Sequence, residues 1–248
     1  MPEFDRVAIV GGAAIASGIA QVAAQAGCQV TVVETDRLTA DLTDAQLNIE
    51  TSSEDREAKH ALLTEIARAA RADAVIVTVT STLSVTDLAT ASARPEQVAG
   101  LHFLDPVAST AIVEVVAGLR TSPDVVERLS TFVTDLGKNP VQVKDRPGFL
   151  INRLLMPYLN DVIQAYDDGL ATAEDLDTAI RLGLGYQQGP LEMLDTIGLD
   201  VHEHATQRAY EALLDPVYAP PPLLRAMVAA GARGNENGNG FRTQEERA

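Results

Sequence analysis

The chain has 248 residues, 46% of them hydrophobic, and a formal net charge of −16 at pH 7. This length allows two domains with a core each, and the excess of acidic residues disfavours nucleic acids and anionic membranes as partners. Cys28 is the only cysteine, so no intrachain disulfide can form, and with no signal-peptide pattern and no long apolar run we expect a cytoplasmic protein.

Residues 1–146 alternate between strand patterns and helix patterns. Short apolar or β-branched runs predict strands over residues 4–10, 29–34, 44–50, 72–80, 101–103, 112–116 and 139–143. Apolar residues at helical spacing predict helices over residues 17–26, 54–70 and 123–136. This alternation predicts an α/β domain with a Rossmann-type, doubly wound and mostly parallel sheet.

The pair Pro147-Gly148 marks the expected domain boundary, so that a first domain spans residues 1–146 and a second spans residues 147–248. Beyond the pair, apolar residues keep helical spacing from Ile151 to Tyr166, for about four turns. Further helices are predicted over residues 173–182, 190–197, 200–214 and 222–230. The second domain is therefore expected to be smaller and all-α, with residues 231–248 forming a loop and a frayed end.

The first strand runs into the turn Gly11-Gly12-Ala13-Ala14-Ile15-Ala16. A dinucleotide-binding unit has, in this order, a strand, a glycine turn, a helix, a second strand and an acidic residue. When the turn is aligned with the pattern G-x-G-x-x-G/A, its three glycine positions hold Gly11, Ala13 and Ala16. The predicted cofactor contacts are Gly11, Ala13, Ile15, Ala16 and Glu34. Glu34 lies 23 residues after Gly11; its carboxylate would accept from ribose hydroxyls and repel a 2′-phosphate, which favours NAD over NADP. The alternative is a plain strand-to-helix turn that binds no nucleotide.

A histidine and a glutamate lie within two apolar strands. His102 stands between Leu101 and Phe103, and Glu114 lies inside the run of residues 111–116. A buried carboxylate is costly unless it is paired, and a histidine is its natural partner because the carboxylate can fix the tautomer and stabilise the protonated ring. If the strands lie side by side, joined by residues 104–110, the two side chains can meet as a proton-transfer pair. The alternative is a solvated histidine at a strand end and a glutamate on an edge.

Several segments, in one order, resemble the L-3-hydroxyacyl-CoA dehydrogenase family, which includes 3-hydroxybutyryl-CoA dehydrogenases. The matching segments are residues 17–27 (the first helix), 81–84 (S-S-L-S), 101–107 (H-F-F-N-P-V), 112–116 (L-V-E-V-V), 147–155 (P-G-F-x-x-N-R-L-L) and 183–192 (the second-domain signature). The resemblance extends from about residue 4 to about residue 241.

This resemblance implies reversible, NAD-dependent oxidation of a 3-hydroxyacyl thioester to the 3-oxoacyl thioester, in fatty acid metabolism. It gives His102 the role of proton acceptor and Glu114 that of its partner. It gives Ser81 a contact with the substrate oxygen and Asn152 a place near the histidine. As alternatives, Ser81 can cap a short helix over residues 85–91, and Asn152 can cap the long second-domain helix.

The resemblance also implies that Glu54 and Lys59 contact the nicotinamide ribose region; the alternative for Lys59 is a helix pair with Asp55. It further implies a homodimer, for which the helices over residues 173–182 and 190–197 are candidate contacts. The substrate would be an acyl thioester of coenzyme A or of a carrier protein. No metal site is predicted, because His202 and His204 are two apart on a helix and do not share a face.

Some positions depart from the family pattern. Ala13 replaces the second glycine, and Val79 replaces an asparagine near the nicotinamide. The helical excursion that helps to hold coenzyme A is reduced to the nine residues 35–43, with Arg37 as their one base, so the first domain is shortened. Gln187-Gln188 replaces Pro-Met and suggests a more polar substrate. Two further functions therefore stay open: a cofactor-impaired paralogue that acts as a non-catalytic binding partner, and a dehydrogenase of an atypical carrier-bound or small hydroxy acid.

Overall fold

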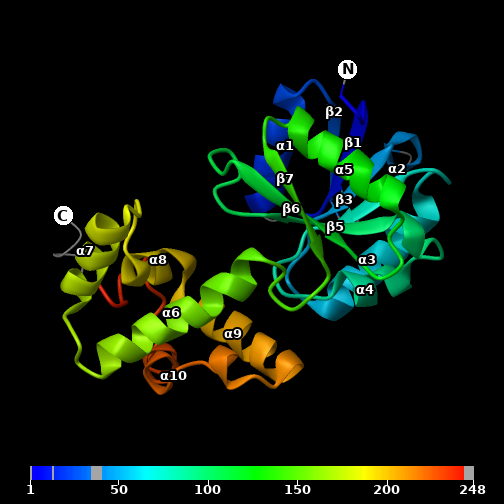
Figure 1. Ribbon diagram of the computed structural model, residues 1–248. Coiled ribbons are helices and arrows are strands. Elements are labelled where there is room, and N and C mark those ends of the chain that lie inside the picture. Colours follow the sequence, from blue (N-terminus) through cyan, green and yellow to red (C-terminus); the bar gives the residue numbers. More distant parts are fainter. Residues whose placement is uncertain (1, 13, 35–40, 243–248) are drawn as a thin grey trace. The chain divides into compact units, whose positions relative to one another are not determined.

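The computed structural model describes residues 2–12, 14–34 and 41–242 (Figure 1). The chain divides into two compact units, Met1–Leu150 and Ile151–Ala248. In the described part of the chain, no helix combines the length and the apolar character that crossing a bilayer requires.

The centre of the first unit is a sheet of seven strands in the order β2-β1-β3-β4-β5-β6-β7. The strands are β1 (Arg6–Val10), β2 (Gln29–Val33), β3 (Leu47–Glu50), β4 (Val75–Thr78), β5 (Val98–Phe103), β6 (Ile112–Ala117) and β7 (Asn139–Lys144). Neighbouring strands are parallel except for the antiparallel pair β5 and β6. The predicted doubly wound, mostly parallel sheet is therefore confirmed.

Helices cover both faces of this sheet (Figure 1). They are α1 (Ala14–Gln25), α2 (Asp41–Asp44), α3 (Arg56–Ala69), α4 (Val85–Leu88) and α5 (Pro123–Asp135), with two 3₁₀ turns at Ala89–Ala91 and Pro95–Gln97. α1 and α5 pack on one face, and α2, α3 and α4 pack on the other. The strand predicted over residues 44–50 begins only at Leu47, because Asp44, a poor strand former, ends α2 instead.

The second unit is helical in its described part, as predicted. Its elements are α6 (Ile151–Asp167), α7 (Ala173–Leu184), α8 (Pro190–Ile197), α9 (Leu199–Leu213), α10 (Pro222–Ala229) and the 3₁₀ turn Pro216–Tyr218. Their apolar faces enclose a main core that includes Leu159, Ile163 and Leu194, and a smaller cluster of Met156, Ala209 and Tyr218.

The prediction of a frayed end is wrong for residues 231–242, which pack against the helices. The Asp195 carboxylate of α8 accepts hydrogen bonds from the backbone N–H groups of Phe241, at 2.8 Å, and Arg242, at 2.9 Å. The Phe241 ring is buried and lies edge-on to Tyr166, with 5.7 Å between ring centroids. A buried aromatic anchor and a carboxylate on a helix thus hold a segment that has the composition of a loop. Residues 243–248 lie outside the described residues.

Candidate active site

Gly11 lies where the strand order reverses, between β1 and β3, at the carboxyl ends of these parallel strands. Open α/β sheets bind ligands at such points. A Cβ on residue 11 would lie 2.7 Å from Thr51 Oγ1 and 2.9 Å from the Thr51 carbonyl carbon, and the Gly11 φ of +129° is one that only glycine adopts readily. At Gly12 an added Cβ would meet no atom within 4 Å. The turn therefore has the close backbone approach and the open surface that a dinucleotide needs.

The rest of the predicted cofactor turn leads into α1. Ala16 is buried against the sheet, as expected of the third position, and Ile15 packs partly against the same core. Glu34 follows the last residue of β2 and is exposed; β2 pairs in parallel with β1, so Glu34 and the glycine turn share one edge. These residues fit a dinucleotide with free ribose hydroxyls. Ala13 lies outside the described residues, as does most of the shortened segment that carries Arg37.

The antiparallel register of β5 and β6 places His102 directly opposite Glu114. His102 Nδ1 lies 2.5 Å from Glu114 Oε2, and the two residues are 2% and 0% exposed. The other oxygen, Oε1, accepts the backbone N–H of Leu150 at 2.9 Å. The predicted meeting of the two side chains is confirmed, and the solvated-histidine alternative is wrong. Because the carboxylate accepts from Nδ1, Nε2 is the ring nitrogen available to take a proton.

Lys138, which sequence reasoning missed, holds the loop between β5 and β6. Its Nζ donates to the carbonyl oxygens of Val107 and Thr110, at 2.6 Å each, and the residue is 7% exposed. Val107 also packs on α1, where a Cβ on Gly18 would lie 2.9 Å from Val107 Cβ. The sequence signal that could have identified Lys138 is the scarcity of lysine, because the chain has only three lysines.

Glu54 and Ser81, both predicted site residues, are brought together where the chain leads into α3 and where it leaves β4. Glu54 Oε1 accepts from Ser81 N at 3.0 Å, from Thr82 N and Oγ1 at 2.8 and 2.9 Å, and from Thr80 Oγ1 at 2.7 Å. Burial alone would raise the pKa of Glu54, but the hydrogen bonds from Thr80 and Thr82 and the charge of Lys59 together lower it. The capping alternative for Ser81 is wrong, because Ser84 Oγ accepts the Asp87 N–H at the start of α4.

Lys59, predicted to contact the nicotinamide ribose region, lies at the first turn of α3. Its residue is fully buried, and its Nζ donates to Glu50 Oε2 at 3.0 Å, to Ser52 O at 3.0 Å and to Val79 O at 2.7 Å. These partners use its three protons, so the alternative of a helix pair with the Asp55 carboxylate is wrong. The reason is that one turn of α3 lies over the end of β3. The contact of Lys59 with the nicotinamide ribose region stays a prediction. Glu50 was missed, although an acid that ends a strand repeats the pattern that pointed to Glu34.

Asn152 is the second residue of α6, in the second unit. It lies within the first turn of the helix and not at the cap position that precedes Ile151, so the capping alternative is wrong. Its place near the histidine stays a prediction. No group of three metal-ligating side chains lies together among the described residues.

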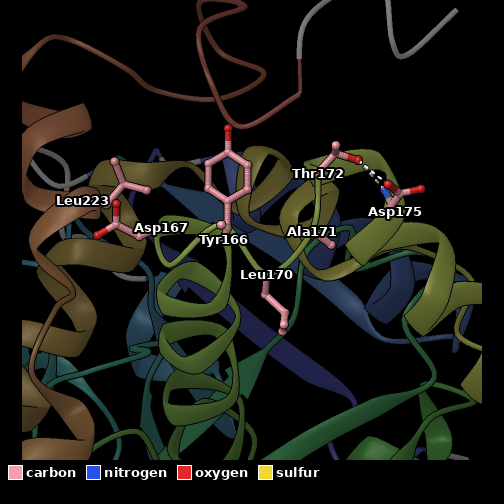
Figure 2. A pocket seen from close by; sticks show the side chains of 8 residues that line it. Tyr166, Asp167, Leu170, Ala171, Thr172, Asp175 and Leu223 are labelled. Atoms are coloured by element: carbon pink, nitrogen blue, oxygen red, sulfur yellow. Dashed lines mark hydrogen bonds between the residues drawn. The ribbon is translucent and has the colours of Figure 1, made fainter.

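A hollow of about 640 Å³ lies in the second unit, where α6 ends and α7 begins (Figure 2). The Tyr166 side chain stands in it, between Asp167 and Leu223 on one side and the hydrogen-bonded pair Thr172 and Asp175 on the other. Because its charged side chains are acidic, this hollow does not suit a nucleotide or a coenzyme A phosphate.

Comparison with known proteins identifies relatives over nearly the whole chain. Residues 34–146 match the model of the 3-hydroxyacyl-CoA dehydrogenase NAD binding domain, and residues 148–244 match that of the 3-hydroxyacyl-CoA dehydrogenase C-terminal domain. The chain is 37% identical to a 3-hydroxybutyryl-CoA dehydrogenase of Mycobacterium tuberculosis over 281 aligned residues, which cover 97% of this chain and 98% of the relative. It is 34% identical to a probable 3-hydroxybutyryl-CoA dehydrogenase of Deinococcus radiodurans, over 94% of this chain and 98% of that protein.

Its structure is similar to a crystal structure of (S)-3-hydroxybutyryl-CoA dehydrogenase from Ralstonia eutropha. The TM-score is 0.93 at 31% sequence identity, over 97% of this chain and 99% of that chain. The alignment with the mycobacterial relative is longer than the 248 residues of this chain, so that relative carries residues that this chain lacks.

Proposed function

The chain belongs to the 3-hydroxyacyl-CoA dehydrogenase family, and from this premise we propose that it reversibly oxidises a 3-hydroxyacyl thioester to the 3-oxoacyl thioester, with the His102–Glu114 pair as the proton acceptor. The cofactor is NAD, as the match to the NAD binding domain indicates. The observation that carries the residue assignment is the buried 2.5 Å contact between His102 Nδ1 and Glu114 Oε2.

His102 takes the hydroxyl proton of the substrate on Nε2. Glu114 stabilises the imidazolium that forms and keeps the ring in the orientation that presents Nε2. The Leu150 N–H holds the second carboxylate oxygen, and the low exposure of both side chains strengthens their attraction. NAD, when bound, would supply the acceptor for the hydride of the carbon that carries the hydroxyl.

Ser81 donates to the substrate oxygen, a type of contact that contributes about 10²-fold in rate. The backbone of Gly11 and Gly12 and the first turn of α1, with Ala13, Ile15 and Ala16, would hold the pyrophosphate, which a helix N-terminus favours. Glu34 would accept from the adenine ribose hydroxyls.

The test is the reduction of acetoacetyl-CoA with NADH, followed by absorbance. We expect turnover by the wild-type protein and a loss of about 10³-fold or more in His102→Ala, since a general base and its orientation are removed together. Unchanged activity in His102→Ala would exclude the assignment. His60→Ala is the matched control, because His60 lies on the surface of α3, where its ring contacts Thr90.

A measurement of cofactor affinity distinguishes the non-catalytic alternative from the proposed enzyme. Titration of the protein with NADH, followed by nicotinamide fluorescence, gives saturable binding if the glycine turn functions despite Ala13. No binding at millimolar NADH would favour a cofactor-impaired paralogue that acts as a binding partner.

We also propose an acyl thioester of coenzyme A or of a carrier protein as substrate. The support for a carrier other than free coenzyme A is the shortened segment over residues 35–43. Acetoacetyl-pantetheine distinguishes the two, because it keeps the arm that both carriers share and lacks the nucleotide. Equal kcat/KM for pantetheine and coenzyme A thioesters would mean that the nucleotide is not recognised, and a panel of small hydroxy acids tests the remaining alternative.

A homodimer is the proposed assembly. Apolar side chains of α7 and α8 support it: Leu182 is 75% exposed, Leu184 64% and Ile197 38%, and exposed apolar side chains that gather in a patch mark interfaces. Light scattering should give the mass of two chains. A cytoplasmic location stays a prediction.

A further inference from the structure

The aromatic ring of Phe149 packs against the imidazole of His102. The two ring centroids lie 5.5 Å apart, with 57° between the ring planes, a separation at which aromatic rings attract each other. Phe149 is 4% exposed and His102 is 2% exposed. Because Glu114 already holds Nδ1 of this imidazole, the Phe149 ring is a second restraint on the same side chain, and an apolar one.

The Phe149 ring has a seat formed by valines beside the histidine. Gly100 and His102 point to the same face of β5, since residues two apart on a strand share a face, and Gly100 lies opposite Val116 of β6. Phe149 packs with Val85 and Val116 in one buried apolar cluster. A Cβ on Gly100 would lie 2.6 Å from Val85 Cγ2 and 3.1 Å from Val116 Cβ. The absence of a side chain at position 100 therefore lets both valines close over β5 and support the ring.

The backbone of Phe149 has a conformation that is unfavourable for a residue with a side chain. Its φ is +50°, and it follows Gly148, whose φ is +77°. Among the described residues, Leu214 is the only other non-glycine residue with a positive φ. Such strained residues persist only where the surrounding structure holds them, and they cluster at functional sites. A glycine would adopt this φ freely, so position 149 carries a ring despite the strain.

The same turn also contacts the other member of the pair. The residue after Phe149 is Leu150, whose N–H donates to Glu114 Oε1 at 2.9 Å. The turn is closed by the Phe149 N–H, which donates to the Arg146 carbonyl oxygen at 2.8 Å. Two consecutive residues of one turn thus restrain both partners, the Phe149 ring on His102 and the Leu150 N–H on Glu114.

Resting on the proposed function, we propose that Phe149 is a positioning residue, which fixes the plane of the His102 ring and thereby keeps Nε2 directed at the substrate hydroxyl. A hydrogen bond at Nδ1 alone tolerates tilting of the imidazole, because the acceptor directions of a carboxylate oxygen are broad. Packing of the Phe149 ring removes this freedom and excludes water from that side of the imidazole. The base is then oriented before the substrate arrives, which is how a reacting group gains rate from position.

Phe149→Leu and Phe149→Tyr test this, with Phe4→Leu as the matched control. Leucine and tyrosine both carry a Cβ, so the backbone strain is the same, and only tyrosine keeps a flat ring. Phe4 is also buried, but its ring packs edge-on to Phe132 of α5, so its loss weakens the core of the same unit and leaves the contact of the Phe149 ring in place.

The expected result is a loss of turnover without a loss of binding. With NADH and acetoacetyl-CoA, kcat should fall about 10- to 100-fold in Phe149→Leu, as for a misplaced reacting group, with KM for acetoacetyl-CoA and the Kd for NADH changed less than about twofold. Phe149→Tyr should recover most of kcat, and Phe4→Leu should keep it. Equal kcat in Phe149→Leu and Phe149→Tyr, or a change confined to KM, would overturn the proposal.

Phe149→Ala and Phe149→Gly separate the ring from the backbone. Both variants lack the ring, and only the alanine variant keeps the strained φ. The glycine variant should therefore withstand more urea than the alanine variant, while kcat should be equally low in both. Wild-type kcat in Phe149→Gly would overturn the proposal, because the backbone of the turn alone would then orient His102.

Modification by diethyl pyrocarbonate supplies a readout without turnover. The reagent acylates accessible imidazole nitrogens, and peptide mass spectrometry distinguishes His102 from the other three histidines. His102 should react at least about tenfold faster in Phe149→Leu than in Phe4→Leu, because local opening around the imidazole becomes easier. Equal rates in the two variants would overturn the proposal. A wild-type protein that fails to reduce acetoacetyl-CoA would contradict the proposed function, while the modification rates would still decide whether Phe149 holds His102.

Discussion

His202 should make the second unit sensitive to mild acid. It lies within α9, is 4% exposed, and its Nε2 contacts Asn160 Oδ1 of α6 at 3.1 Å. Burial lowers the pKa of this imidazole from 6.5 to about 4. Asn160 in turn donates to Thr206 Oγ1 at 2.9 Å, and Thr206 donates to the Tyr218 carbonyl at 2.6 Å, so the ring is one end of a buried polar chain.

The sign and size of the effect follow from linkage. Above pH 6.5 the ring is neutral in both the folded and the unfolded chain, so it does not lower the free energy of unfolding. Below pH 6.5 the unfolded chain binds a proton that the folded chain refuses, so the free energy of unfolding falls until the folded imidazole is protonated near pH 4. A pKa difference of this size corresponds to a loss of about 3 kcal/mol.

The assay exploits the placement of the tyrosines. The chain has five tyrosines and no tryptophan, and all five lie in the second unit, so tyrosine emission during urea unfolding reports that unit. His202→Gln, which keeps an N–H donor for Asn160 and does not titrate, should remove the fall between pH 7 and pH 4.5. His204→Gln, an exposed neighbour on α9, should keep it. A wild-type protein whose stability relative to His202→Gln is constant over that range would refute this reasoning.

Three further outcomes are expected. Asn48 is fully buried, and neither of its side-chain polar atoms has a hydrogen-bond partner among the described residues. Asn48→Leu should therefore raise the free energy of unfolding, measured by urea denaturation, by about 1–3 kcal/mol. A decrease would mean that the amide has hydrogen-bond partners. Gly11→Ala should lower the free energy of unfolding by about 1–3 kcal/mol and weaken NADH binding, because the added Cβ clashes with Thr51. Gly12→Ala should leave thermal unfolding unchanged. Equal thermal unfolding of the two variants would argue against a close backbone approach at the turn. Lys138→Met should leave two loop carbonyls without a hydrogen-bond donor, which lowers the free energy of unfolding by about 1–3 kcal/mol for each carbonyl. It should also lower kcat more than it weakens NADH binding. Unchanged kcat in a destabilised protein would show that the loop does not position His102.

Some of this site could be predicted from the sequence because a local pattern specified the partner. Glu114 lies within an apolar strand, where only a paired carboxylate is tolerated, and the short loop to His102 limits the pairing to neighbouring strands. The edge that carries Gly11 and Glu34 was equally predictable, since the order of strands and helices in a doubly wound sheet fixes which ends meet.

The remainder depends on contacts that no local spacing specifies. Lys59 has helical spacing on either interpretation, and only the register of α3 over β3 decides that its ammonium points into the protein. Phe241 lies in a Gly/Asn-rich tail, and nothing in that composition indicates that the Asp195 carboxylate holds its backbone. Asn152 belongs to the second unit, so no pattern within one domain could test its role.

The distribution of lysine favours an enzyme over a non-catalytic binding partner. Two of the three lysines, Lys59 and Lys138, are 0% and 7% exposed in a chain with a net charge of −16. A buried Lys–Glu pair seldom improves stability over apolar residues of the same volume, because desolvation offsets the attraction. The presence of Lys59 is therefore better explained by what it fixes, the loops that carry Glu54 and Ser81. Lys138, whose ammonium bonds two carbonyl oxygens, closes the loop between His102 and Glu114. A protein that served only as a binding surface would gain nothing from holding these two loops so tightly at the edge where β4, β5 and β6 present their polar side chains.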